Sequence, residues 1–190
     1  MRSSQSTFSQ SNGPTWLFWG FLTATAAGIY IVESLIMRVV PLPFIRLGLS
    51  NIVILYLVWH RQLGAAILVN IAKSVIGGIV TFTLLSPAIL LSIGGGLTAI
   101  LGMSLALMLR PRFSVFGISI VGAICHNLAQ LILVRYIIIE QSGVFLLTPI
   151  LIFFGLISGL VTAYILVHLE KIIPDTKAKH ENKETKTELK

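Results

Sequence analysis

Val121-Gly-Ala-Ile-Cys-His-Asn-Leu-Ala-Gln-Leu-Ile-Leu-Val-Arg135 lies inside an otherwise apolar segment that is long enough to cross a bilayer. It nevertheless carries His126, Asn127, Gln130 and Arg135. On a helix, His126 and Gln130 lie one turn apart on the same face, with Asn127 beside them. Because lipid offers no hydrogen bonds, we expect this polar face to point into a helix bundle or a cavity.

The rest of the chain also has the composition of a membrane protein. Of its 190 residues, 55% are hydrophobic and 11% are charged, whereas a soluble domain carries about 25% charged residues. At about 20 apolar residues per span, the apolar part leaves room for five to seven membrane helices. We divide the chain into a disordered lead (1–15), a transmembrane domain (16–169) and a charged tail (170–190).

Apolar runs separated by prolines, glycines and charges predict six membrane-spanning helices. The second run is short and follows Pro41–Asn51, whose two prolines exclude a regular helix. Such a segment enters a membrane only where protein or a cavity surrounds it. The fold class is therefore an all-α membrane protein with a six-transmembrane-helix bundle. The predicted spans are Trp16–Met37, Leu47–Trp59, Gly64–Leu85, Ala88–Leu109, Ser114–Ile139 and Phe145–Leu169.

Positive charge gathers on one side of these predicted spans. Cytoplasmic loops carry the excess of Lys and Arg, so we expect both termini to be cytoplasmic and the protein to be multi-pass. A signal peptide is the less favoured interpretation of the N-terminus, because the apolar run continues past any small-residue cleavage site. The side taken as cytoplasmic carries Arg2, Arg61, Arg110, Arg112 and the lysines of the tail, and the opposite side carries Arg38 and Glu140.

Several classes of function find no support in the sequence. The formal net charge is +7, but no basic stripe interleaved with aromatics is present, so nucleic acid is not an expected partner. Cys125 is the only cysteine, which excludes an internal disulfide. There are no paired aspartates to hold Mg²⁺ on a diphosphate and no Gly-x-x-x-x-Gly-Lys-Ser/Thr loop. We therefore expect no catalytic residues, metal or cofactor, while enzymatic activity stays an open question.

Cations inside the membrane predict an anionic ligand. Arg46 lies in the proline-bent segment, Lys73 lies near mid-span, and Glu33 is the acid within the spans. A carboxylate, phosphate or diphosphate would offset the surplus of positive charge. Arg46 would supply a bidentate fork and Lys73 a point charge. The predicted ligand-binding set, in a pocket open to the outside, is Arg46, Asn51, Lys73, His126, Asn127 and Gln130.

Several polar residues of the spans also have a purely structural interpretation. Lys73 can pair with Glu33 instead of with a ligand, because buried charges are normally paired. Arg135 can extend its guanidinium to the outer interface. Hydrogen bonding between helices is the structural alternative for His126, Asn127 and Gln130.

The first span contains a patch of small residues. Ala24 and Gly28 are four residues apart, which places them on one helix face. Such spacing allows another helix to approach closely. We expect this patch to dock a partner subunit, with ordinary packing inside the bundle as the alternative.

Three blocks resemble the signature of a bacterial family. The blocks Phe44–Val53, Ser92–Gly96 and Gly117–Gln130 are similar to those of the Gx transporter family, which is also labelled heptaprenyl diphosphate synthase component I. That family is similar to the S components of energy-coupling factor transporters, which are six-helix proteins that bind a vitamin or its precursor from outside. The resemblance implies an S-component-like fold in the bacterial inner membrane. It also implies that ATPase and coupling membrane subunits dock at Ala24 and Gly28.

Three hypotheses follow for the function. The leading one is a transport or substrate-capture subunit for a small anionic molecule, with an isoprenoid or a vitamin precursor as candidates. The second is a membrane subunit of a heptaprenyl or other polyprenyl diphosphate synthase. The third is a membrane scaffold without a ligand. Co-purification separates them, since ATPase subunits favour the first, a soluble Asp-rich synthase favours the second, and neither favours the third.

Overall fold

The computed structural model describes residues 15–39, 48–109, 113–137 and 142–188, and the regular elements within those ranges are all helices. Five of these helices are long and apolar enough to cross a membrane. The prediction of an all-α membrane protein is therefore confirmed. The five apolar segments are Leu17–Ile36, Leu63–Val80, Pro87–Met108, Val115–Ile137 and Phe145–Lys171.

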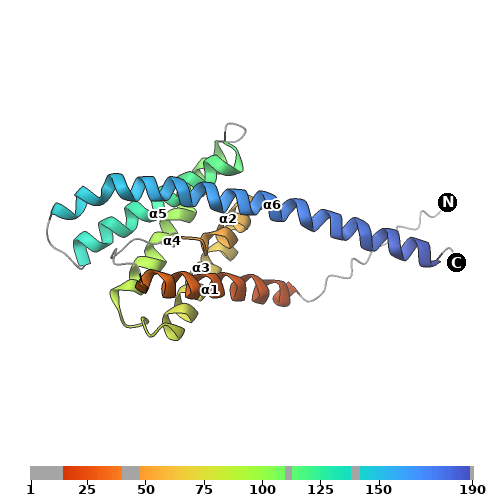
Figure 1. Ribbon diagram of the computed structural model, residues 1–190, viewed down its shortest axis with the longest axis horizontal. Helices are drawn as coiled ribbons and strands as arrows, with labels where there is room; N and C mark the ends of the chain where they lie inside the picture. The colour runs from red at the N-terminus through yellow and green to blue at the C-terminus, as the bar shows by residue number, and fades with distance from the viewer. Residues whose placement is uncertain (1–14, 40–47, 110–112, 138–141, 189–190) are drawn as a thin grey trace, which may run out of the picture.

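The order of the elements along the chain can be followed in Figure 1. They are α1 (Thr15–Val39), α2 (Asn51–Trp59), α3 (Leu63–Val80), α4 (Pro87–Met108), α5 (Val115–Ile137), the 3-10 helix η1 (Ser142–Leu147) and α6 (Thr148–Glu188).

The boundary between α3 and α4 reflects local chemistry. The predicted end of the third span, Leu85, is wrong, because α3 already ends at Val80 and Phe82 takes a left-handed φ of 55°. The next helix starts at Pro87, one residue before the predicted start at Ala88, since proline has the fixed φ that suits a first helical position. The Ser86 hydroxyl caps α4 by accepting the Ala88 N–H at 3.3 Å.

The second helix differs in kind from its neighbours. Its nine residues rise only about 14 Å, less than half the thickness of the hydrocarbon core. A helix this short does not cross a bilayer by itself. It is nevertheless largely buried, because it packs against α1, α3, α4 and α6. Protein rather than lipid therefore surrounds α2, as expected for a short helix at membrane depth.

Small residues let the remaining helices pack closely around α2. The α4–α5 and α5–α6 pairs form much of the bundle, and α1 lies against α3. A Cβ on Gly102 of α4 would lie 2.6 Å from Cys125 Sγ, and one on Gly159 of α6 would lie 2.7 Å from the Ile120 Cα of α5. A larger residue at Gly159 would collide with the backbone of α5 and force the helices apart, and one at Gly102 would displace the Cys125 side chain.

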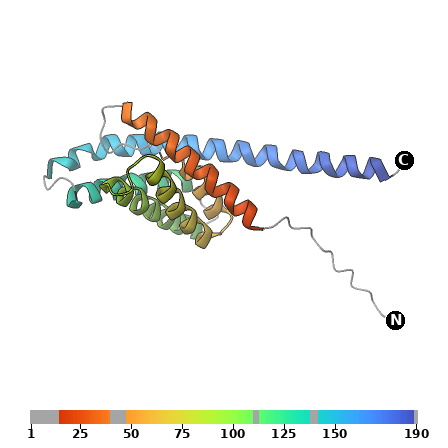
Figure 2. The same cartoon turned by 90° about the horizontal axis from the view of Figure 1, so that it is seen from below.

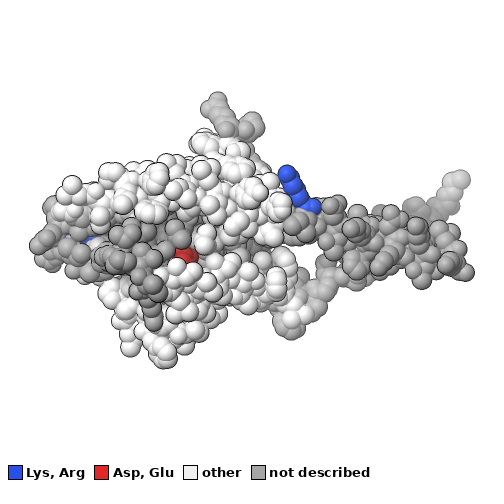
Figure 3. Space-filling view, in the orientation of Figure 1, with Lys and Arg blue, Asp and Glu red and all other residues white. Residues whose placement is uncertain are grey.

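The outer surface and the ends of the bundle complete the arrangement. One face of the described surface is almost free of charged side chains (Figure 3), and many large apolar side chains are exposed. A lipid environment accounts for this exposure, which would be costly in water. The beginning of α1 lies at the end of the bundle from which α6 extends outwards (Figure 2). From Glu170, the backbone of the predicted charged tail continues α6 to Glu188, whereas residues 1–14 of the predicted lead lie outside the described ranges.

Candidate functional site

Two buried charged side chains hold the turn that precedes α2. Gly48 takes a φ of 69°, which glycine adopts without strain, and its carbonyl accepts the Asn51 N–H at 2.9 Å. The Glu33 carboxylate, from α1, accepts a hydrogen bond from the Gly48 N–H. The Lys73 ammonium, from α3, donates to Ser50 Oγ at 3.0 Å and to Asn51 Oδ1 at 2.8 Å. An acid and a base from two different helices therefore bind the same turn.

Both of these charged groups are removed from solvent. Lys73 is 2% exposed and Glu33 is 6% exposed. Ions taken out of water need compensating charges or hydrogen bonds, because their desolvation costs several kcal/mol. The turn supplies two oxygen acceptors to the ammonium and a backbone donor to the carboxylate. Its geometry consequently depends on both ionisable groups.

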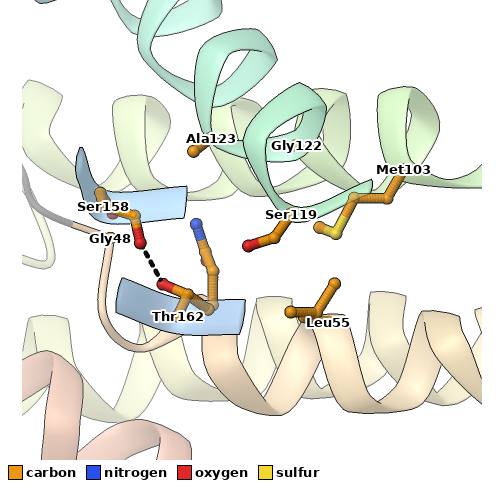
Figure 4. A pocket seen from close by; sticks show the side chains of 9 residues that line it. Gly48, Leu55, Met103, Ser119, Gly122, Ala123, Ser158 and Thr162 are labelled. Atoms are coloured by element: carbon orange, nitrogen blue, oxygen red, sulfur yellow. Dashed lines mark hydrogen bonds between the residues drawn. The ribbon is translucent and has the colours of Figure 1, made fainter. Parts of the chain in front are cut away.

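A small cavity lies beside this turn, between α2, α4, α5 and α6. Its internal volume of about 10 Å³ is enough for about one water molecule. Figure 4 shows Ser158 and Thr162 of α6, joined by a hydrogen bond, on one side of the cavity, and Ser119 of α5 with the apolar side chains of Leu55 and Met103 on the other. The remaining lining residues are Gly48, Asn51, Gly122 and Ala123.

Hydrogen bonds connect the cavity both to the bundle and to the buried ammonium. Ser119 Oγ donates to the Gly159 carbonyl at 2.8 Å, joining α5 to α6. Thr162 Oγ1 donates to the Ser158 carbonyl one turn earlier on its own helix, at 2.7 Å. Asn51 belongs to both groups, because it lines the cavity and accepts a hydrogen bond from Lys73. The amide of Asn51 thus links the ammonium to the cavity.

The polar face of α5 is buried, as predicted, but its members contact different helices. Asn127 Nδ2 donates to the Leu151 carbonyl of α6 at 2.9 Å. His126 and Gln130 instead lie against α4, where a Cβ on Gly95 would be 2.9 Å from His126 Cε1 and 3.1 Å from Gln130 Cγ. Gln130 is 1% exposed, and among the described residues neither of its amide atoms has a hydrogen-bond partner.

A polar seam also joins α3 to α4. Asn70 Nδ2 donates to the Ile93 carbonyl at 3.1 Å, and the Ser74 and Ser92 hydroxyls share a hydrogen bond of 2.8 Å. The close approach depends on Gly96, because a Cβ there would lie 1.9 Å from Asn70 Oδ1. The glycine run of α4 therefore accommodates polar side chains from α3 and from α5.

The predicted ligand-binding residues are only partly brought together. Lys73 and Asn51 are in direct contact, whereas His126 and Gln130 share the α4 glycine face. Asn127 binds α6, which is the interhelical role that the sequence left open. Arg46 lies outside the described residues. Arg135, half-buried near the end of α5, lies with its guanidinium carbon 5.9 Å from the centre of the Tyr136 ring.

Four hydroxyl residues of this region were absent from the predicted site. Ser50 holds the ammonium, and Ser119, Ser158 and Thr162 line the cavity. Their sequence signal is weak, because serine and threonine in membrane helices commonly bond a carbonyl of their own helix. Only Ser50 could have been indicated by the sequence, because it precedes Asn51 in a proline-bent segment.

The predicted docking patch lies on the outside of α1. Ala24 and Gly28 are both exposed. A Cβ built on Gly28 would meet nothing within 4 Å. The patch is therefore not used for packing between the described helices.

The described residues contain no group of three or more His, Cys, Asp or Glu side chains arranged to hold a metal ion. A comparison with protein families finds that the model described as heptaprenyl diphosphate synthase component I matches residues 22–169, from within the first apolar helix to near the end of the last apolar segment. No curated protein and no solved structure matches the chain.

Proposed function

We propose, from the premise that this chain belongs to the heptaprenyl diphosphate synthase component I family, that it is an integral membrane subunit which captures a small anionic molecule within the bilayer. The observation that carries this proposal is the ammonium of Lys73, a buried cation that contacts Asn51 at the wall of a cavity. A positive group next to the cavity favours a ligand that carries a carboxylate, phosphate or diphosphate. The apolar side chains of Leu55 and Met103 suit an isoprenoid or a vitamin precursor.

Capture requires the cavity to expand. Sites for small molecules usually have volumes of roughly 300–1,000 Å³, whereas this one has about 10 Å³. The four helices around it would have to separate towards the outer face to admit a ligand. In the open state, Asn51 would offer its amide to the ligand. Gln130, a buried amide without a hydrogen-bond partner among the described residues, would bind a second polar group.

Arg46 anchors the anionic group of the ligand in this proposal. It precedes Gly48 by two positions in the chain, and Gly48 lines the cavity. Its planar guanidinium can bind a carboxylate or phosphate through two parallel hydrogen bonds, which a lysine cannot do. His126 and Asn127 complete the set as groups that orient the ligand.

The arrangement of the chain in the membrane is part of the same proposal. We infer six crossings of an S-component-like bundle in a bacterial cytoplasmic membrane, the second made by Leu47–Trp59, with both termini cytoplasmic. Support comes from the common end of the bundle at which α1 begins and from which α6 extends outwards and from the Lys/Arg bias of the loops. Cysteine labelling checks it: Ala88→Cys should react from outside and Gln62→Cys from inside, and the reverse pattern would remove the outward pocket.

The second candidate is a membrane subunit of a polyprenyl diphosphate synthase. The description of the matching family favours it, because "component I" of a synthase implies a partner component. In this role the chain would hold the partner and its lipid-like product at the membrane, and the partner would supply the acidic residues that bind metal and diphosphate. Affinity purification separates the two candidates, since a soluble Asp-rich partner supports the synthase and an ATPase with a coupling subunit supports transport.

The decisive experiment for capture identifies what the purified protein retains. Untargeted mass spectrometry of the detergent-purified protein names the molecule, and binding isotherms then compare variants. Arg46→Ala should weaken binding by roughly tenfold to over a hundredfold, as expected for one charge-assisted contact. Arg46→Lys should restore part of the loss, and Gln130→Ala should cost less because its contact is neutral. If the folded Arg46→Ala protein binds as wild type does, then Arg46 does not anchor the ligand.

A further inference from the structure

The C-terminal end of α2 holds an arginine where the backbone favours glycine. The Arg61 N–H donates to the Val58 carbonyl at 2.9 Å, and the Gln62 N–H donates to the Leu57 carbonyl at 2.8 Å. These two bonds form a Schellman motif, in which the residue after the C-cap takes a left-handed conformation and is usually glycine. Here that residue is Arg61, with a φ of 60°. The protein therefore places a long cationic side chain at a backbone position that is strained for any residue other than glycine.

That arginine lines a second cavity, separate from the one beside Lys73. The cavity has a volume of about 150 Å³. This is below the roughly 300–1,000 Å³ of sites that enclose a whole small molecule, so the cavity can hold only part of a larger ligand. Its walls come from the beginning of α3 and the last turns of α4. Apart from Arg61, the lining residues are Leu63, Ser104, Leu107 and Met108.

The position of this cavity is at the boundary of the apolar bundle. Leu63 is 40% exposed and Met108 is 80% exposed, so the rim opens towards the surroundings of the bundle. At the same end, His60 Nε2 lies 3.3 Å from Glu170 Oε1. Glu170 marks the transition from the apolar part of α6 to its charged part. The cavity therefore lies where acyl chains meet head groups.

The charge and the walls of the cavity complement one class of molecule. In the described part of the chain, no carboxylate lies within 4.0 Å of Arg61, and the Glu170 carboxylate at this end contacts His60. A guanidinium binds a phosphate through two parallel hydrogen bonds. Basic pockets between membrane helices bind anionic lipid head groups in this manner. We propose that the cavity binds an anionic phospholipid, with its phosphate on Arg61 and an acyl chain along the apolar wall.

Because Arg61 has a left-handed backbone conformation that suits glycine, its replacement by glycine removes the charge without disturbing the fold. Arg61→Gly removes the guanidinium and relieves the left-handed strain, so its thermal unfolding temperature should be at least that of wild type. Native mass spectrometry of protein mixed with equimolar phosphatidylglycerol and phosphatidylcholine measures retention of each lipid. Arg61→Gly should retain phosphatidylglycerol about fivefold less, as expected for one surface cation near anionic lipid. Retention of phosphatidylcholine should stay the same.

Three further variants complete the experiment. Arg61→Lys should keep most of the preference for phosphatidylglycerol, because it keeps the charge. Lys171→Gln, a matched loss of an exposed charge on α6, should behave as wild type. Ser104→Phe, which fills the cavity and keeps Arg61, should lower retention of phosphatidylglycerol.

The opposite results would overturn the proposal. Wild-type retention by Arg61→Gly would show that the arginine binds no lipid phosphate, and an equal loss in Lys171→Gln would show only a general surface attraction. If Arg61→Gly loses a co-purifying protein while it keeps phosphatidylglycerol, the cavity is a protein docking site instead. None of these outcomes depends on the ligand proposed for the site beside Lys73.

Discussion

Replacement of Lys73 by methionine removes the ammonium and keeps an unbranched side chain that fills similar space. The variant loses two charge-assisted hydrogen bonds, to Ser50 Oγ and to Asn51 Oδ1. Each such bond contributes about 1.5–3 kcal/mol, and removing a buried charge recovers part of this through its desolvation. The two acceptors stay buried and lose a donor, which adds to the cost. We expect the free energy of unfolding to fall by about 3 kcal/mol, within the range for breaking a buried ionic contact.

The single cysteine of the chain makes the measurement direct. Cys125 is half-buried on α5, so a thiol-reactive fluorophore will report thermal unfolding in detergent. A loss of about 3 kcal/mol corresponds to a fall in midpoint temperature of about 6–12 °C for a chain of this size. Lys171→Met is the matched control, because that lysine is exposed and its replacement should change stability by less than about 0.5 kcal/mol.

A double-mutant cycle then tests the contact itself. Asn51→Ala combined with Lys73→Met should destabilise by about 1–3 kcal/mol less than the sum of the single variants, because both remove the same hydrogen bond. A midpoint for Lys73→Met within about 2 °C of wild type would refute the reasoning. Strict additivity in the cycle would show that the ammonium stabilises the protein through other groups.

The packing of the bundle gives further expectations. Gly96→Ala should lower the free energy of unfolding by about 1–3 kcal/mol, because its Cβ would lie 1.9 Å from Asn70 Oδ1. Thermal unfolding measures this change. Gly20→Ala is the control, because a Cβ on Gly20 would meet nothing within 4 Å. Gly28→Leu should leave the unfolding temperature unchanged and should weaken pull-down of a partner membrane subunit; unchanged pull-down would mean that the patch faces only lipid. Asn127→Ala should cost about 1–2 kcal/mol in a chemical or thermal melt, because a carbonyl of α6 loses its donor at 2.9 Å.

The spans were predictable because the physical requirement behind them is local. A helix in lipid needs enough consecutive apolar residues, and five of the predicted spans correspond to long apolar helices of the structure. The shortness of the second helix was also visible, since two prolines precede it. The end of α3 was not predictable from the apolar pattern, because Thr81, Phe82 and Leu84 beyond it are compatible with a helix.

Burial of the polar face of α5 followed from the sequence, whereas its contacts did not. Lipid cannot satisfy His126, Asn127 and Gln130, so their burial was required wherever the helix lay. Adjacent positions on a helix point about 100° apart, so neighbouring residues in a bundle can face different helices. Which helix each one faces depends on how α5 is rotated against α4 and α6, and side-chain packing along the whole interface sets that rotation.

The site around α2 is a product of the tertiary structure. Glu33, Lys73 and the turn from Gly48 to Asn51 come from three separate parts of the chain, and they meet only because α2 is enclosed between α1 and α3. The cavity hydroxyls carry no sequence mark, since each can bond a carbonyl of its own helix as Thr162 does. The apolar surroundings in the sequence required that the buried charges be compensated. Helix packing decided that one turn would do so, through a backbone N–H for Glu33 and two side-chain oxygens for Lys73.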